Sequence, residues 1–479
     1  MHHCALLIGG RLIGGECDQG VMHQVVWAPF DRAVIGSAAE GGWPELERCI
    51  DSAHEAFKTW RTSTRHERRS LLRRIVELVS ERRDELVDLL TREVGKPISW
   101  SRAEVDRLAL TFELAADLVS SYGTESLPLD ADPRAGNSYR CSVERFPIGA
   151  ILCMTPYNWP FNLTAHKIAP ALATGNTVVL KTSPLAPLST LTLARLIHDA
   201  DCPPGVVNAW NGADRHVARA LEDKRVRMLS FTGSAKVGWM LKEKLSDRKV
   251  TLELGGDAMV IVGPDADWEF AVKRIVAGGY GYAGQVCIAV QHVLVHESIY
   301  PEVRGDLMEA TEACPTGDPL DEATVCGPLI SLEAAERVKG MVDEALEWGA
   351  VLLAGGGLKG SLMRPTLLEN VSPQVRLTQE EVFGPVVTLA PYSEIGEAIA
   401  RVNRSQYGIQ TGLFTQSQPD IERAYREIET GGLIVNDYPT LRFDNMPYGG
   451  VKRSGFGREG VRYAMDEMTE TKTLVVRTP

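Results

Sequence analysis

Short apolar runs alternate with longer amphipathic stretches through most of this chain. Between residues 65 and 94, apolar residues recur every three or four positions, from Leu71 to Leu90, which predicts one long helix with an apolar face. β-rich runs then follow at 148–154, 177–180, 206–210, 228–231 and 250–254, with helical stretches between them. This alternation requires right-handed crossovers. It predicts a parallel sheet with helices on both faces, as in a nucleotide-binding α/β domain.

A second strand–helix alternation spans residues 257 to 465 and predicts a further α/β domain. Its β-rich runs lie at 258–262, 292–295, 386–389 and 433–435, and the triple glycine at 355–357 is interpreted as a turn. Two more β-rich segments, 137–146 and 471–476, have no obvious partner strand in their own domain. We therefore expect them to take part in pairing between subunits.

Composition and charge narrow the class of protein. The chain has 479 residues, 44% of them apolar and 24% charged, which is enough for about three domains or subdomains with real cores. These values exclude collagen-like, disordered and disulfide-scaffold proteins. The net charge of −12 argues against a nucleic-acid partner and favours an enzyme that acts on a small molecule.

Neither the apolar runs nor the cysteines indicate a membrane or an exported protein. No run approaches the roughly 18 residues of a membrane-spanning helix, and the N-terminus lacks the basic and apolar regions of a secretory signal. The nine cysteines are scattered without paired spacing, as expected of reduced thiols in the cytoplasm. The histidines do not group with a third ligand, so no metal site is predicted.

Four features of the two α/β regions have both a structural and a chemical interpretation. Cys287 lies between small residues after a glycine-rich stretch. It can be interpreted as a buried structural thiol or as a nucleophile. Glu253 is at the end of an apolar strand. It can be interpreted as a buried acid or as a general base at the edge of the sheet where ligands bind. Asn158 lies in a proline-flanked turn at another strand end. The segment 233–238 is either a tight strand–helix connection or an anion site at a helix N-terminus.

Taken together and in this order, these features closely resemble the aldehyde dehydrogenase superfamily. The resemblance runs from about residue 5 to the C-terminus and rests on eight motifs, at 93–97, 156–160, 181, 231–234, 252–256, 284–287, 381–385 and 447–452. It implies an α/β fold with three parts. These are a Rossmann-like, five-stranded cofactor domain (residues 1–123 and 143–254), an α/β catalytic domain (255–465) and a β-arm for oligomerisation (124–142 and 466–479). It also implies a homodimer or homotetramer.

The resemblance implies that the chain oxidises a small aldehyde to its carboxylic acid with NAD or NADP. Cys287, as thiolate, would attack the aldehyde carbon, and Asn158 together with the Cys287 N–H would hold the oxyanion of the thiohemiacetal. Glu253 would activate the water that hydrolyses the resulting thioester, with Lys167 in the proton relay. The implied cofactor-binding residues are Thr155, Pro156, Lys181, Ser183, Gly233, Ser234, Glu381 and Phe383.

One departure from the family pattern concerns the choice of cofactor. NAD-preferring members usually have a glutamate three residues after the lysine, where this chain has Pro184. Because a carboxylate there would repel a 2′-phosphate, its absence makes NADP acceptable. We expect activity with both dinucleotides.

The substrate side of the resemblance points to small polar or anionic aldehydes. Arg107 and Arg442 fall in two regions where members that act on anionic aldehydes place arginines, and Tyr157 is a third candidate substrate residue. The stretch 443–450 resembles lactaldehyde, non-phosphorylating glyceraldehyde-3-phosphate and phosphonoacetaldehyde dehydrogenases. Val286, where some phosphate-binding members have arginine, argues against a dedicated phosphate site.

Two alternatives use the same fold. A CoA-acylating dehydrogenase is disfavoured because such members generally lack the base at Glu253. A non-catalytic protein that retains the fold is disfavoured because Cys287, Asn158 and Glu253 are present together.

Overall fold

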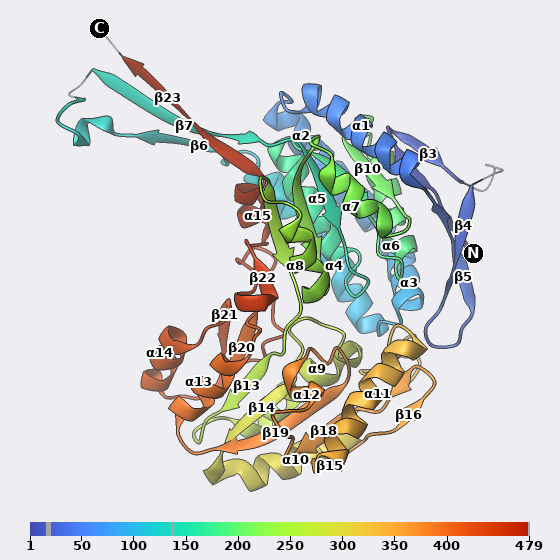
Figure 1. Cartoon of the computed structure of the whole chain (residues 1–479), viewed down its shortest axis with the longest axis vertical. Coiled ribbons are helices and arrows are strands. Elements are labelled where there is room, and N and C mark those ends of the chain that lie inside the picture. Colours follow the sequence, from blue (N-terminus) through green and yellow to red (C-terminus); the bar gives the residue numbers. More distant parts are fainter. Residues whose placement is uncertain (16–20, 136–137, 478–479) are drawn as a thin grey trace.

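Two largely parallel sheets form the frame of the molecule, one above the other in the computed structural model (Figure 1), which describes residues 1–15, 21–135 and 138–477. The first sheet has the order β22-β12-β11-β8-β9-β10-β2-β3. Its five central strands confirm the predicted nucleotide-binding sheet and run parallel to one another. They are β8 (Ala150–Met154), β9 (Thr177–Lys181), β10 (Val207–Trp210), β11 (Val226–Thr232) and β12 (Lys249–Glu253).

Helices cover this sheet because its central strands are buried. β8, β9 and β10 are buried along their whole length, so both of their faces must be covered. α1 contacts β8, β9 and β10, α5 packs on β8 and β9, and α6 packs on β10. The helices concerned are α1 (Trp43–Trp60), α5 (Asn162–Thr174), α6 (Pro187–Asp199), α7 (Arg215–Glu222) and α8 (Ala235–Glu243).

The predicted long helix over 65–94 is two helices, which corrects the sequence interpretation. α2 (Arg65–Glu81) ends and α3 (Arg83–Val94) begins at Arg82, whose backbone leaves the helical region at φ −106° and ψ 17°. The apolar face continues across this one-residue break with neither proline nor glycine to mark it. Periodicity alone therefore could not detect it. Both helices pack against α4 (Ile98–Leu118), and α4 packs against α5.

The N-terminal residues add strands that the sequence analysis did not predict. β2 (Leu6–Ile8) and β3 (Arg11–Ile13) extend the first sheet at its β10 edge. β1 (His2–Cys4), β4 (Met22–Trp27) and β5 (Val34–Glu40) form a separate three-stranded sheet in the order β1-β5-β4.

The second sheet has the order β15-β18-β19-β14-β13-β20-β21 and confirms the second α/β region. Four of its strands were predicted, and β15, β18 and β20 were not. The strands are β13 (Met259–Val262), β14 (His292–His296), β15 (Val351–Ala354), β18 (Thr366–Glu369), β19 (Val386–Tyr392), β20 (Gln410–Phe414) and β21 (Gly432–Val435). Its helices are α9 (Trp268–Tyr280), α10 (Tyr300–Glu312), α11 (Leu332–Glu347), α12 (Arg376–Gln379), α13 (Ile395–Arg404) and α14 (Gln418–Glu427).

The triple glycine, predicted as a turn, is an irregular connection between strands. It connects β15 to a small hairpin of β16 (Leu358–Lys359) and β17 (Leu362–Met363). Gly355 and Gly356 have φ of 76° and 80°, a left-handed conformation that glycine adopts without strain.

The chain returns from the second sheet to the first near its end. β22 (Gly455–Phe456) pairs antiparallel with β12, and α15 (Val461–Glu467) packs on α4 and α5. This return brings the segment before β22 over the carboxyl end of β12. Residues from both sheets thus meet there.

The two β-rich segments for which the sequence suggested no partner strand pair with each other. β7 (Tyr139–Pro147) pairs antiparallel with β23 (Thr469–Arg477) and with β6 (Thr124–Leu127), which makes a three-stranded arm that projects from the body (Figure 1). The sequence analysis left them unpaired within the subunit because they are more than three hundred residues apart. Residues 136, 137, 478 and 479 of the predicted arm lie outside the described residues.

No helix in the described part of the chain is long and apolar enough to cross a membrane.

Candidate active site

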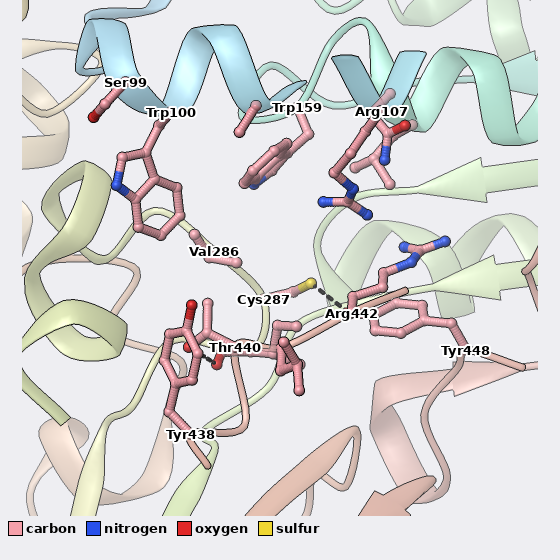
Figure 2. Close-up of a pocket in the computed structure, with 15 residues that line it drawn as sticks. Ser99, Trp100, Arg107, Trp159, Val286, Cys287, Tyr438, Thr440, Arg442 and Tyr448 are labelled. Carbon is pink, nitrogen blue, oxygen red and sulfur yellow. Dashed lines mark hydrogen bonds between the residues drawn. The ribbon is translucent and has the colours of Figure 1, made fainter. Parts of the chain in front are cut away.

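Two cavities meet at Cys287, one of about 360 Å³ and one of about 570 Å³. The smaller cavity is shown in Figure 2, with α4 on one side and the segment 438–448 on the other. The larger cavity lies along the carboxyl ends of β8, β9, β11 and β12. In open α/β sheets this edge is where ligands bind.

The loop that presents Cys287 is strained and tightly held. It follows α9 as a short turn, Gly281–Gly284, in which Tyr282 and Ala283 have φ of 53° and 52°. Such positive φ values cost energy in residues with a side chain and persist only where the surroundings fix them. Here Gln285, fully buried, donates to the carbonyls of Tyr282 and Pro328 and accepts from the N–H of Ile330. The nucleophile candidate is therefore on a rigid support.

Asn158 reaches this loop from the turn after β8. Its Nδ2 donates to the carbonyl of Gln285 at 2.9 Å, and the side chain is 4% exposed. The structure thus brings together Asn158 and Cys287, as the sequence analysis expected of two groups in one site.

The Cys287 thiol is hydrogen-bonded to a residue to which the sequence analysis assigned no role. Its Sγ lies 2.9 Å from the hydroxyl of Tyr448 (Figure 2). Burial raises the pKa of the Cys287 thiol to about 12, and the hydrogen bond to Tyr448 acts against that rise.

Glu253 is buried at the end of β12, with neither carboxylate oxygen hydrogen-bonded to a described residue. Burial, and then the negative charge of Glu459, raise the pKa of Glu253 well above its ordinary value. Glu459 is a second residue that the sequence analysis missed. It accepts from Lys167 at 2.8 Å, and Lys167 also donates to Ser230 at 3.1 Å.

The Glu459 carboxyl is kept ionised by two cations. Burial alone raises its pKa, but Lys167 and then Arg442 lower it below the ordinary value. One buried carboxylate of the pair is thus charged and the other holds its proton to a higher pH. Such divergent pKa values are typical of sites that move protons.

Arg107 and Arg442 both line the smaller cavity, but their surroundings differ. Arg107 forms a two-pronged ion pair with Asp444, at 2.6 and 3.0 Å. Asp444 also accepts from His166 at 2.8 Å and from Asn162 at 3.3 Å. Although Asp444 is buried, these donors lower the pKa of its carboxyl far below the ordinary range. The charge of Arg107 is therefore already matched within the protein.

Among the described residues, no carboxylate is hydrogen-bonded to Arg442 as Asp444 is to Arg107. Its side chain is 6% exposed, and its Nε and Nη2 find no hydrogen-bond partner among the described residues. The nearest carboxylate oxygen, on Glu459, is 3.6 Å away, and the guanidinium lies 3.9 Å from the centre of the Tyr448 ring. Buried polar groups without partners are rare in folded proteins and point to a missing ligand or water.

The remaining lining of the smaller cavity is mostly apolar and aromatic. It includes Trp100 and Trp159, whose rings lie 6.0 Å apart, and Tyr438. Tyr157, predicted as a substrate residue, lines the larger cavity and is absent from the described lining of the smaller one. Its ring packs edge-on against Phe383 and its hydroxyl donates to Gln285 at 3.3 Å.

All the predicted cofactor residues line the larger cavity: Thr155, Pro156, Lys181, Ser183, Gly233, Ser234, Glu381 and Phe383. Helix α8 begins beside it, and Ser234 at the N-cap makes no side-chain capping bond, so the first N–H groups of α8 are open to an anion. The hydroxyls of Thr155 and Thr232 are buried without partners among the described residues. These features fit a dinucleotide with its pyrophosphate at the helix N-terminus.

Two acidic groups border the larger cavity. Glu381 accepts from the N–H of Gly256 at 3.2 Å, and burial raises its pKa to about 7. A Cβ at Gly255 would lie 2.2 Å from the Glu381 carboxylate, so a larger residue there would displace that carboxylate. The second group, Asp214, was missed from the sequence, and it lies 2.6 Å from the ammonium of Lys181.

No group of three or more His, Cys, Asp or Glu side chains within residues 1–15, 21–135 and 138–477 is arranged to hold a metal ion.

Comparison with known proteins places this geometry in context. The chain matches the aldehyde dehydrogenase family over residues 18–474. It is 42% identical over 468 residues to 3-sulfolactaldehyde dehydrogenase of Priestia megaterium, covering 98% of each chain. The structure of aldehyde dehydrogenase 21 from Physcomitrella patens in complex with the reaction product succinate has a TM-score of 0.96 at 36% identity, covering 99% of this chain and 98% of that one. Glyceraldehyde-3-phosphate dehydrogenase GapN from Methanocaldococcus jannaschii, complexed with NADP, has a TM-score of 0.92 at 37% identity, covering 96% and 100%.

Proposed function

Because the chain belongs to the aldehyde dehydrogenase family and is an NAD(P)-dependent, non-acylating enzyme, we propose that it oxidises short anionic aldehydes to their acids through Cys287. The observation that supports the anionic substrate is Arg442. Its guanidinium lines the cavity at Cys287, is buried, and has two nitrogens without a hydrogen-bond partner among the described residues, although Nη2 lies 3.6 Å from the Glu459 carboxylate. A carboxylate, sulfonate or phosphate on the aldehyde would supply the missing acceptor.

The relatives named above support the same substrate class. They are a dehydrogenase of a sulfonated aldehyde, an aldehyde dehydrogenase in complex with its product succinate, and a dehydrogenase of a phosphorylated aldehyde. In each case a short carbon chain ends in a charged group. A cavity of about 360 Å³ is compatible with a molecule of that size.

The reaction begins at the Cys287 sulfur. The thiolate adds to the aldehyde carbon and the carbonyl oxygen takes up the negative charge. The Asn158 amide and the Cys287 N–H hold this oxygen, a role in which one donor is typically worth about 10²–10³ in rate. For this, Asn158 exchanges its bond with the Gln285 carbonyl for one with the substrate. A bound dinucleotide would supply the two-electron hydride acceptor that is needed to turn the Cys287 thiohemiacetal into a thioester.

Glu253 then removes a proton from the water that attacks the thioester. The carbon–sulfur bond breaks, which releases the carboxylic acid and returns Cys287 to the thiolate. A carboxyl whose pKa is raised is a stronger base than an ordinary one, and it gains that strength from burial and from Glu459. The Lys167–Glu459 pair lies beside it and passes the proton onward. Hydrolysis at this base, in place of transfer to coenzyme A, gives the free acid.

The larger cavity holds the dinucleotide. We expect the N-terminus of α8 with Gly233 and Ser234 at the pyrophosphate, Lys181 at the adenosine ribose, and Glu381 with Phe383 at the nicotinamide end. Pro184 brings no charge to the ribose, so both NAD and NADP are accepted.

Asp214 shifts that choice towards NAD. Its carboxylate already neutralises Lys181, and it is 74% exposed at the cavity border. A ribose 2′-hydroxyl can donate to Asp214 and accept from Lys181, whereas a 2′-phosphate meets the carboxylate as a like charge.

The projecting arm supports assembly into a homodimer or homotetramer. Leu474, Val475 and Val476 of β23 are each about half exposed, and because side chains alternate along a strand they leave apolar surface on both faces of the arm. Sedimentation analysis measures the mass of the assembly, and a monomer at micromolar concentration would overturn this expectation.

A panel of aldehydes tests the proposed substrate class. The panel is 3-sulfolactaldehyde, succinic semialdehyde, glyceraldehyde 3-phosphate, lactaldehyde, hexanal and benzaldehyde, each assayed with NAD and with NADP. We expect the charged aldehydes to have the highest kcat/KM. If hexanal or benzaldehyde is the best substrate, the cavity at Arg442 does not select for charge.

A further inference from the structure

The hydroxyl of Tyr448 lies beside the sulfur on which the proposed reaction depends. We propose that Tyr448 is a further catalytic residue, which donates a hydrogen bond to the Cys287 sulfur and so stabilises the thiolate before it attacks. This rests on the proposed function, in which Cys287 is the nucleophile.

The position of Tyr448 is fixed by its surroundings. Its side chain is 4% exposed, and its backbone N–H and carbonyl pair with Glu459 at 3.0 and 2.7 Å. The neighbouring Gly449 has a φ of 154° and faces Glu253, where a Cβ would lie 3.0 Å from the carboxylate. The phenol therefore points at Sγ from a backbone that cannot easily shift. The 2.9 Å contact is a property of this packing.

The chemistry of the two groups gives the bond its direction. A neutral thiol can donate or accept, but a thiolate can only accept. Burial raises the pKa of the Tyr448 phenol well above its ordinary value, so the phenol keeps its proton at neutral pH. Tyr448 is therefore a donor to the sulfur and not a base towards it.

The charges around the sulfur make such a donor important. Burial, Glu381 and Glu253 all disfavour a thiolate at Cys287, and Tyr448 and Arg442 favour it. Arg442 also lies over the Tyr448 ring at 3.9 Å, where a cation polarises the phenol and strengthens its O–H as a donor. The same arginine thus faces the proposed anion site and the group that holds the nucleophile.

A second tyrosine in the same cavity, Tyr438, provides a matched control for Tyr448. Tyr438 also lines it, with the guanidinium of Arg274 at 3.9 Å from its ring centre. The hydrogen bond to Cys287 is made by Tyr448 and not by Tyr438. The variants Y448F and Y438F therefore each remove a phenol hydroxyl from a similar aromatic environment. Only Y448F also removes the hydrogen bond to the Cys287 sulfur.

The test is the rate at which iodoacetamide alkylates Cys287 as a function of pH in the full-length enzyme, without dinucleotide. Hydrogen bonds to charged groups contribute enough to change a thiolate population by roughly 10- to 100-fold. We expect Y448F to slow alkylation at neutral pH by about that factor and to move its midpoint to higher pH. Y438F should stay within about twofold of the wild type. In turnover, Y448F should lose a similar factor with charged and with neutral aldehydes, because the hydroxyl acts on the sulfur and not on the substrate tail.

Two further measurements separate the possible failures. If C287S still turns over, or if peptide mapping finds another cysteine alkylated at the active-site rate, the proposed function itself is wrong. If Cys287 is the alkylated residue and Y448F leaves its midpoint unchanged, the role of Tyr448 is overturned and the proposed function stands. Should Y448F fail to fold, 3-fluorotyrosine at position 448 keeps the shape with a more acidic phenol. We expect it to lower the midpoint, and an unchanged midpoint would again overturn the proposal.

Discussion

The two cavities that meet at Cys287 are built in different ways. The larger one is lined by strand ends, a helix N-terminus, apolar side chains and separate charged groups, which are the Lys181–Asp214 pair, Lys244, Arg337 and Glu381. The smaller one is bordered by a connected cluster of charges, the partly buried Arg107 and the buried Asp444, Arg442 and Glu459, and some polar atoms of the last two have no hydrogen-bond partner among the described residues. We infer that the larger cavity serves to bind the dinucleotide and that the charge cluster at the smaller one acts on the chemistry.

The sources of the two linings differ as well. The larger cavity is formed mostly by consecutive strand–helix connections of one sheet. The smaller cavity combines α4, the turn before α5, the Cys287 loop and the segment 438–448, which are distant in sequence. Changes in the first should alter dinucleotide affinity, and changes in the second should alter chemistry and pH dependence.

The largest expected effect comes from Cys287→Ala. Loss of the nucleophile should reduce turnover by at least about a thousandfold. Dinucleotide affinity, measured by calorimetry, should stay within a few-fold, because most of the larger cavity is untouched. Retained turnover would refute the nucleophile, and lost affinity would show that the two cavities are not separable.

Glu253→Gln should stop the reaction at a different point. We expect a rapid burst of about one NAD(P)H per active site followed by a stall, since the thioester forms but is not hydrolysed. Stopped-flow absorbance measures the burst.

The wild-type enzyme gives the matching pH dependence. Glu253 has a raised pKa and must be ionised to act as a base, so kcat should rise as the pH rises through that pKa. The Glu253→Gln variant should not show this rise of kcat with pH. A variant without a burst would place Glu253 earlier in the reaction, at the thiol.

Arg442→Leu should distinguish charged from neutral substrates. A charge-assisted anchor is worth about 1.5–3 kcal/mol, so kcat/KM for charged aldehydes should fall about 10- to 100-fold more than for acetaldehyde. Equal losses for both would show that Arg442 acts only through Tyr448 and the thiol.

Arg107→Leu is the companion variant. Because Arg107 is paired with Asp444, its removal leaves a buried carboxylate with fewer donors, and the free energy of unfolding should fall by about 2–3 kcal/mol. Denaturant unfolding measures this. A variant as stable as the wild type, with a loss confined to charged substrates, would make Arg107 the anion anchor in place of Arg442.

The smallest expected effect is on cofactor choice. Asp214→Asn keeps the size of the side chain and removes the charge that faces Lys181. We expect the ratio of kcat/KM for NADP to that for NAD to increase by roughly 3- to 10-fold. An unchanged ratio would indicate that Asp214 turns away from the ribose when the dinucleotide binds.

The sequence predicted the first sheet well because its five central strands are local apolar runs of a few residues. The residues that the resemblance assigned to a cofactor lie in short motifs, and all of them line the larger cavity, while their role stays a prediction. The break at Arg82 was missed because the apolar period continues through it. The pairing of β7 with β23 was missed because their separation in sequence leaves no local signal.

The charged side of the site could not be predicted in the same way. Glu459, Asp444 and Asp214 look like ordinary surface acids in the sequence and become informative only through their partners. Arg442 was predicted as a substrate residue, but only the three-dimensional structure shows that two of its nitrogens have no hydrogen-bond partner among the described residues. Tyr448 lies in a motif that the sequence analysis had noted, and its contact with Cys287 comes from the return of the chain to the first sheet.

The proposal that a thioester forms on Cys287 can be tested by mass spectrometry of the Glu253→Gln enzyme after one turnover with NAD(P) and the best aldehyde of the panel. We predict that the intact mass increases by that of one acyl group and that peptide mapping places it on Cys287. An unmodified protein after a full burst, or an acyl group on another residue, would contradict the account.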